Sequence, residues 1–273
     1  MADTDYVEKI QKWRRDYAQK LAAPDGWLAA AGLFWLEPGD NFFGTSPDNK
    51  IVLPAGSAPD YAGVFHFSEN GIRLQAVEGV IITVNDQPVS TIHVQLDENG
   101  SSEWIILNDL KLSVIQRGMR YGVRIFDKNN PSIKQSVYLR WFPIQEKYVI
   151  QARFIPSPEP KCISIVNVIG DHVEMPSPGT VEFSLQREKN HLLAIELEDG
   201  RLWFMFKDLT NGDLTYPGGR YLTADAPVDG VVTLDFNRAY NPPCAFTDFA
   251  TCPLPPRSNY FDVPIRAGAL KFH

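Results

Sequence analysis

Cysteine is scarce in this sequence of 273 residues, which contains only Cys162, Cys244 and Cys252. Three thiols are too few, and odd in number, for a disulfide scaffold, so we expect reduced cysteines. The five histidines are scattered and show neither a His-x-His nor a His-Glu-x-x-His spacing. We therefore expect no metal site and no bound cofactor. The glycine patterns of phosphate-binding and dinucleotide-binding loops and the Gly-x-Ser-x-Gly elbow are also missing, which argues against nucleotide chemistry and the usual serine-hydrolase design.

Positive charge is also in short supply, since 26 Lys and Arg face 33 Asp and Glu for a net charge of −7. A protein that binds nucleic acid concentrates positive charge, so we expect no nucleic-acid partner. No stretch approaches the roughly 18–20 apolar residues that a membrane-spanning helix needs. The N-terminal sequence "MADTDYVEKIQKWRRDY" has no apolar core of a signal peptide. A cytoplasmic protein without membrane contact is the expectation.

One amphipathic helix stands out over residues 5–22, where apolar and aromatic side chains recur every three or four positions. These are Tyr6, Ile10, Trp13, Tyr17 and Leu21. The sequence "PDG" at 24–26 then predicts a stop and a turn.

From about residue 41 the pattern changes to short β runs separated by turn residues. Eight such runs follow one another up to residue 127, and two of them, "GIRLQAV" and "STIHVQLD", alternate as half-buried antiparallel strands do. A second β series begins near residue 160. We therefore predict a mainly β protein: an N-terminal helix and connector (1–29), a β-sandwich (30–142), and a second antiparallel sandwich or barrel (143–273). One continuous β structure is the alternative, because the proline-rich link between the two series is short.

Polar side chains gather where the strand "GVVTLDF" ends and a proline-rich segment begins. Asp235, Asn237, Arg238, Tyr240 and Asn241 lie there, and polar groups at a strand end commonly build a pocket. The functional interpretation has Arg238 binding a carboxylate or phosphate, with Asp235 and Tyr240 as catalytic proton carriers. In the alternative, Asp and Asn cap the turn and Arg238 pairs with a nearby acid.

The stretch "DLTYPGGRYL" predicts a tight turn with positive φ at a glycine, which would fix the direction of Arg220 and place Tyr216 nearby. Arg220 then either contacts an anion or covers an aromatic face. Cys244 lies eight residues before Cys252. A catalytic thiolate there needs a base or a cation close by, and otherwise both cysteines are buried apolar groups that pin the loop.

The segments "FKDLTNGDLTYPGGRYLTAD" and "LDFNRAYNPPCAFTDFATCPLPPRSNYFDVPIRAGALKF" closely resemble a bacterial and archaeal family catalogued as domain of unknown function 1684. The N-terminal "GWLAAAGLFWLEPGDNFFGTSPDNKIVLP" and "RYGVRIFD" are similar to the same family. This resemblance implies no reaction. Family members often end in Ala-Gly-Glu-Lys, where this chain has "AGAL" at 267–270, so an acid is missing at Ala269.

Residues 39–90 resemble forkhead-associated phosphopeptide-binding domains in the order and spacing of their expected strands. Gly44 is followed by Thr45 instead of arginine, and His66 has no serine three residues before it. Phosphate recognition needs cationic and hydroxyl donors, so only the sandwich shape is expected to be shared.

Three functions follow from these patterns. The first is a small-molecule binding protein or cofactor-independent enzyme that acts on an anionic organic ligand at the C-terminal loop. Its expected ligand contacts are Tyr216, Arg220, Asn237, Arg238, Asn241 and Cys244, with Asp235 as base. The alternative is a protein–protein interaction module that uses the N-terminal sandwich and the aromatic helix face of Trp13 and Tyr17. A metal-dependent hydrolase ranks third.

Overall fold

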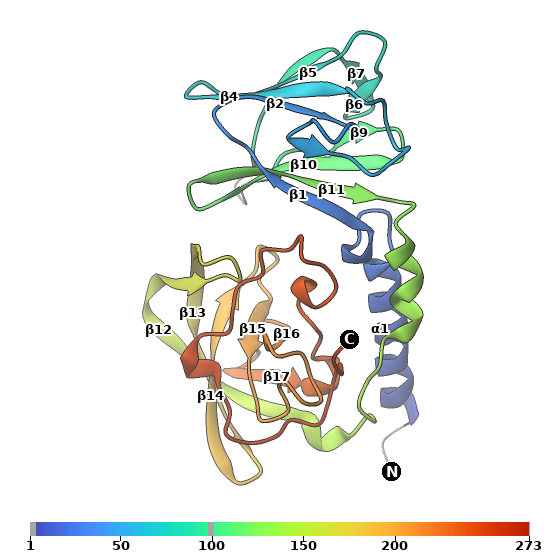
Figure 1. Cartoon of the computed structure of the whole chain (residues 1–273). Helices are drawn as coiled ribbons and strands as arrows, with labels where there is room; N and C mark the ends of the chain where they lie inside the picture. Colours follow the sequence, from blue (N-terminus) through green and yellow to red (C-terminus); the bar gives the residue numbers. More distant parts are fainter. Residues whose placement is uncertain (1–3, 98–100, 273) are drawn as a thin grey trace. The chain divides into compact units, whose positions relative to one another are not determined.

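The structure is a computed structural model that describes residues 4–97 and 101–272. The chain divides into two compact units (Figure 1). Residues 20–136 form the N-terminal unit, and residues 137–273 together with 1–19 form the C-terminal unit. The division falls between residues 136 and 137, and residues 4–19 belong to the same unit as the C-terminal half of the chain.

Helix α1 (Thr4–Leu21) confirms the helix predicted over residues 5–22. Its exposed side carries two ion pairs between residues four apart, Lys9–Asp5 at 2.6 Å and Lys12–Asp16 at 2.7 Å. Such pairs add a few tenths of a kcal/mol each, so packing of the aromatic face holds the helix in place. None of the helices in residues 4–97 and 101–272 has the length and apolar character required to span a membrane.

The N-terminal unit is built from eleven strands among its described residues. They are β1 (Ala30–Trp35), β2 (Gly39–Gly44), β3 (Ile51–Val52), β4 (Gly63–Ser68), β5 (Gly71–Ala76), β6 (Ile82–Val84), β7 (Gln87–Val89), β8 (Thr91–Val94), β9 (Ile105–Leu107), β10 (Leu110–Arg117) and β11 (Arg120–Asp127). The 3₁₀ turns η1 (Trp27–Ala29) and η2 (Pro131–Tyr138) lie before and after them.

These strands form two sheets, in the orders β1-β11-β10-β9-β6-β7 and β3-β2-β4-β5-β8. The apolar core draws Phe43, Phe65 and Leu74 from the five-stranded sheet and Leu112 and Val123 from the six-stranded sheet. Because side chains alternate along each strand, one face of each sheet supplies this core. The predicted β-sandwich is confirmed for this part of the chain.

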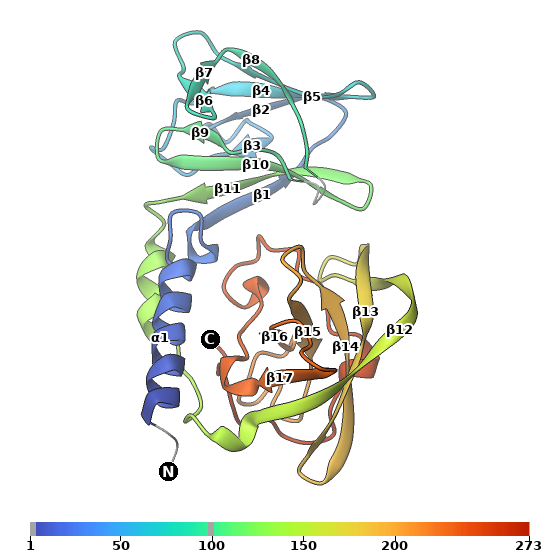
Figure 2. The ribbon, with the colours of Figure 1, turned by 180° about the vertical axis from the view of Figure 1, so that it is seen from behind.

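The C-terminal unit contains one antiparallel sheet in the order β16-β15-β14-β13-β12-β17. Its strands are β12 (Val149–Val166), β13 (His172–Leu185), β14 (Glu188–Glu196), β15 (Leu202–Phe206), β16 (Arg220–Ala224) and β17 (Val231–Asp235). The 3₁₀ turns are η3 (Glu146–Tyr148), η4 (Phe236–Arg238), η5 (Pro243–Ala245) and η6 (Arg257–Asn259). Beyond β17 the chain pairs with β16, because Tyr221 and Tyr240 exchange two backbone hydrogen bonds of 2.9 Å. The sheet therefore curls until its two ends meet (Figure 2). This arrangement agrees with the second antiparallel β unit predicted from the sequence.

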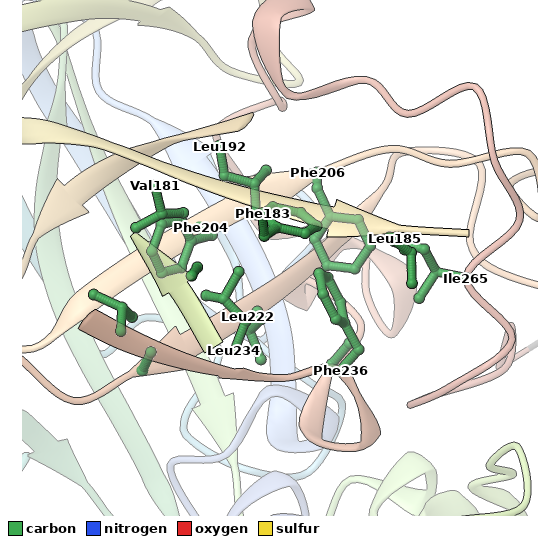
Figure 3. Close-up of a cluster of buried hydrophobic side chains, with 14 of the residues drawn as sticks. Val181, Phe183, Leu185, Leu192, Phe204, Phe206, Leu222, Leu234, Phe236 and Ile265 are labelled. Carbon is green, nitrogen blue, oxygen red and sulfur yellow. The ribbon is translucent and has the colours of Figure 1, made fainter. Parts of the chain in front are cut away.

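The interior of this curled sheet is filled by aromatic and aliphatic side chains (Figure 3). Phe183, Phe206 and Phe236 pack edge to face or tilted, with ring centroids 5.4–6.0 Å apart. The C-terminal tail takes part, because every second side chain of residues 261–267 is buried in the same cluster. These side chains are Phe261, Val263, Ile265 and Ala267.

A buried ion pair fixes this tail to the sheet. Arg220 Nη2 lies 2.6 Å from Asp208 Oδ2, and neither side chain is exposed. The same guanidinium donates hydrogen bonds to the backbone carbonyls of Ile265, at 2.8 Å, and Ala267. Burial lowers the pKa of Arg220, and the charge of Asp208 opposes that shift. The ion pair therefore ties strand β16 and the loop after β15 to the closing segment.

The turn before Arg220 behaves as predicted, because Gly219 has a φ of +101°. A Cβ atom at this position would lie 2.6 Å from Pro255 Cγ and 2.7 Å from the carbonyl oxygen of Phe206. Only glycine fits both the conformation and the space, so the Gly-Gly turn sets the direction of Arg220.

Replacement of Asp208 by Asn keeps the size of the side chain but leaves the guanidinium of Arg220 buried and unpaired. We expect the free energy of unfolding to fall by about 3–5 kcal/mol in urea titrations. Glu182→Gln is the matched control. It breaks the exposed Arg153–Glu182 pair, also 2.6 Å long, and should cost less than about 1 kcal/mol. Equal losses in the two variants would contradict a structural role for the Arg220–Asp208 pair.

Candidate functional site

The polar residues after β17 hold α1 in place. Asp235 caps η4, since its Oδ1 accepts a hydrogen bond from the amide of Asn237 at 3.1 Å and from the Tyr6 hydroxyl at 2.9 Å. Asn237, which is fully buried, donates to the Tyr6 hydroxyl and to the carbonyl of Gln145, both at 2.9 Å. Burial, followed by the charge of Asp235, raises the pKa of Tyr6. Asp235 therefore caps the turn, as the alternative interpretation expects, and Asn237 links the turn to Tyr6 and Gln145.

The aromatic face of α1 packs within the same unit. Trp13 stacks on Tyr17 with ring centroids 5.6 Å apart, and Trp141 lies edge-on to both rings. The Tyr17 hydroxyl donates to the carbonyl of Asn241 at 3.0 Å. These contacts occupy the aromatic face that an interaction module would need to keep free for a partner.

Tyr240 and Asn241 serve the closure of the sheet. The ring of Tyr240 lies between those of Tyr17 and Tyr221, at 5.6 and 5.9 Å, and burial raises its pKa. Asn241 donates to the carbonyl of Leu270 at 2.7 Å. These contacts give both residues a structural role in the unit.

The two arginines expected to contact an anionic ligand have different surroundings. Arg220 has no exposed atom, and its charge is balanced by Asp208. Its guanidinium carbon lies 5.2 Å from the centre of the Phe206 ring, which matches the alternative of an arginine over an aromatic face. Arg238 keeps 41% of its side chain exposed and lies 3.5 Å from Asp235. Arg220 therefore has no group to offer a ligand in this structure.

Cys244 and Cys252 are brought together by the loop between them. Cys244 lies in η5, and its backbone amide donates to the Sγ atom of Cys252 at 3.1 Å. The Tyr216 hydroxyl donates to the carbonyl of Cys244 at 3.0 Å. Cys244 is partly exposed, whereas Cys252 is buried. Both are free thiols. The loop therefore holds two neighbouring cysteines, one of which is accessible to solvent.

The surroundings shift the pKa values of the two thiols in opposite directions. The thiol of Cys252 donates a hydrogen bond to Cys244, and this donation, helped by the Tyr216 hydroxyl and opposed by burial, lowers the pKa of Cys244 to about 7. The same hydrogen bond, together with burial and the nearby charge of Cys244, raises the pKa of Cys252. Cys244 is thus the thiol that ionises, and Cys252 is the one that keeps its proton.

Backbone contacts anchor both sides of this pair. The amide of Val168 donates to the carbonyl of Cys252 at 2.9 Å, and the amide of Leu254 donates to Val166 at 2.8 Å. The Tyr221 hydroxyl donates to the carbonyl of Pro253 at 2.7 Å. The loop therefore pairs with the end of β12, and its prolines leave little conformational freedom to lose.

Two surface hollows lie away from the cysteines. One of about 350 Å³ lies over the outer face of β12–β14 and is lined by Arg153, Glu182, Lys189 and His191. The other, of about 590 Å³, belongs to the N-terminal unit and has a largely apolar lining that includes Phe67, Ile72 and Tyr121. Within residues 4–97 and 101–272, no group of three or more His, Cys, Asp or Glu side chains is placed to hold a metal ion.

The candidate residues fall in a stretch that is similar to known sequences. The family described as "Protein of unknown function (DUF1684)" matches residues 137–270. The solution structure of an uncharacterised protein from Haloarcula marismortui is 33% identical, covers 48% of this chain and 75% of its own, and has a TM-score of 0.42. The chain belongs to this family of unknown function.

The family match begins with the C-terminal unit and contains every site residue predicted from the sequence, but it does not extend to the N-terminal segments. Two solved forkhead-associated (FHA) domains each cover 34% of this chain at 16% identity and a TM-score of 0.25. One comes from a study of phosphothreonine-dependent FHA interactions, and the other is the FhaA FHA domain in complex with the intracellular domain of another protein. At these scores the likeness supports no functional argument. Comparison with curated proteins gives no match.

The structure adds partners that the sequence patterns did not single out. Tyr6 and Tyr17 contact Asp235 and Asn241 from more than 220 positions away, so no local signal marks them. Asp208 lies twelve residues before Arg220, and Cys252 lies eight residues after Cys244. This closeness in sequence was the only sign that the two members of each pair meet.

Tyr216→Phe removes the hydroxyl that supports Cys244. We expect the pKa of Cys244 to rise toward the ordinary thiol value of about 8.5. Thiolate absorbance in the ultraviolet, followed against pH in a Cys162→Ser background, measures this change. Tyr260→Phe, at an exposed tyrosine, is the control and should leave the titration unchanged. An unaltered titration in Tyr216→Phe would show that the hydroxyl has no influence on the thiol.

Proposed function

We propose that the C-terminal unit is a small-molecule site without a bound cofactor, and that the Cys244 thiolate is its reactive group. The observation that carries this proposal is the position of the partly exposed Cys244, whose amide donates to Cys252 Sγ at 3.1 Å and whose carbonyl accepts from the Tyr216 hydroxyl at 3.0 Å. The lowering of the pKa of Cys244 to about 7 supports it. Thiolate, rather than thiol, is the nucleophile in cysteine chemistry. A binding protein that captures its ligand covalently and an enzyme that turns it over both use this step.

The structure gives less reason to expect a negatively charged ligand than the sequence patterns did. An anionic ligand was to be oriented by Arg220 and Arg238, but Arg220 is buried beside Asp208 and Arg238 lies beside Asp235. The proposal therefore keeps the small organic ligand and the C-terminal loop, and it moves the centre of the site from the arginines to Cys244.

The chemistry requires no separate base. A thiol with a pKa of about 7 is about half ionised at neutral pH. The sulfur adds to an electrophilic carbon, an S–C bond forms, and an electron pair moves onto the electronegative atom of the ligand, which takes a proton from water. The rigid loop supports this reaction, because a fixed nucleophile loses little entropy when the ligand binds.

Alkylation by iodoacetamide tests the reactive thiol. In the Cys162→Ser protein, we expect the rate of Cys244 labelling, followed by mass spectrometry, to rise with pH through a midpoint near 7. Cys252 should stay unlabelled until the protein unfolds, because it is buried and protonated. A midpoint near the unperturbed value of about 8.5, or no labelling of folded protein at Cys244, would contradict the proposal.

A thermal-shift screen of electrophilic metabolites tests whether the site takes a ligand. We expect at least one compound to raise the melting temperature of the Cys162→Ser protein and to add its mass to Cys244. The double variant Cys162→Ser/Cys244→Ser should show neither effect, because serine is not ionised at neutral pH. Compounds that stabilise both proteins equally would place the ligand elsewhere.

A further inference from the structure

We propose that Cys244 and Cys252 form a redox pair that reduces hydroperoxides and closes to a disulfide. This inference rests on the proposed function, because it uses the same reactive Cys244. It adds a substrate class, the hydroperoxides, and a chemical role for the buried Cys252.

The geometry of the loop brings the two sulfur atoms within reach. Cys252 Sγ lies 3.1 Å from the backbone nitrogen of Cys244, and that nitrogen is about 1.5 Å from its own Cα. The Sγ atom of Cys252 is therefore within about 5 Å of the Cα atom of Cys244. A disulfide needs Cβ atoms roughly 4 Å apart, which this arrangement permits without moving the chain far.

Separate anchors hold the two cysteines, so their proximity does not depend on the loop alone. Tyr216 contacts the carbonyl of Cys244, whereas Val168 contacts the carbonyl of Cys252. Tyr221 contacts the carbonyl of Pro253, next to Cys252. Tyr221 belongs to β16, Tyr216 to the turn before β16 and Val168 to the turn after β12, so the curled sheet holds the backbone on both sides of the pair.

The first step takes place at the exposed thiol. The Cys244 thiolate attacks the terminal oxygen of the hydroperoxide ROOH, so that an S–O bond forms and the O–O bond breaks. The electron pair leaves with RO⁻, which takes a proton from water to give ROH. Cys244 is now a sulfenic acid, two electrons more oxidised than before.

The second step uses Cys252. Its proton is held chiefly by the hydrogen bond to Cys244 and also by burial and by the charge of the Cys244 thiolate. Oxidation of Cys244 removes that charge, which makes Cys252 a better nucleophile only after the first step. The Cys252 sulfur attacks Cys244, the S–S bond forms, the S–O bond breaks, and hydroxide combines with the Cys252 proton as water. In total, ROOH and two thiols give ROH, water and one disulfide.

The reaction fits the exposure of the two residues. Cys244 is open to a small oxidant, whereas Cys252 is only 4% exposed and meets an electrophile chiefly when Cys244 presents one. A buried resolving thiol also stops further oxidation of Cys244, since disulfide formation removes the sulfenic acid.

The experiment uses full-length Cys162→Ser protein, reduced and then treated with hydrogen peroxide or an organic hydroperoxide in small excess. We expect the intact mass to fall by two hydrogens, peptide mapping to find a Cys244–Cys252 disulfide, and dithiothreitol to restore the starting mass. Cys252→Ser should stop at a sulfenic acid on Cys244, which dimedone traps. Cys244→Ser should leave Cys252 reduced, with a rate of peroxide consumption lower by at least about tenfold.

The controls separate this inference from the proposed function. If Cys244 is alkylated with a midpoint near pH 7 but peroxide gives no disulfide, or only over-oxidised Cys244, the redox pair is refuted and the proposed thiol site stands. If Cys244 is not alkylated in the folded protein, both fail. Cys252→Ala is a second variant for the trapping experiment. The disulfide assay itself needs no substitution at either cysteine, so a folding defect in a variant does not decide the result.

Discussion

The buried ion pair of Arg220 and Asp208 is the contact on which the C-terminal unit depends. It lies where β16 begins, and it binds the carbonyls of Ile265 and Ala267, so the final segment is held against the sheet. A charge taken out of water needs a close partner, and removal of that partner is far more costly than loss of a surface pair. The loop that carries the cysteines lies between β17 and this pinned tail and takes its rigidity from both ends.

The chemistry of the site comes from neutral donors and not from a cation. Cys244 is stabilised as a thiolate by Cys252 and Tyr216, and the thiol of Cys252 keeps its proton for the same reason. Tyrosine hydroxyls hold the adjacent carbonyls. Because both neighbours are held by the curled sheet, the thiol site that we propose needs little rearrangement when a ligand binds. In the same unit, Asp235 and Asn237 are used to hold α1.

The predicted fold followed from patterns that are local in sequence. The helix of residues 4–21 and the alternating strands can be predicted from the sequence, because each element must place its apolar side chains on one face. The Tyr216–Gly219 turn was predictable because only glycine accepts its positive φ. The partners of Arg220, Asp235 and Tyr240 were not predictable, because Asp208, Tyr6 and Tyr221 meet them only in the folded chain.

The sequence by itself determined a mainly β protein, an amphipathic first helix and a proline-stiffened loop that carries two cysteines, since periodicity and backbone restriction are properties of short segments. The tertiary structure alone decided that the helix joins the C-terminal unit, that Arg220 is neutralised in the interior, and that Cys252 faces Cys244. Burial and hydrogen bonding set the charge of a side chain, and both depend on residues brought together from distant parts of the chain.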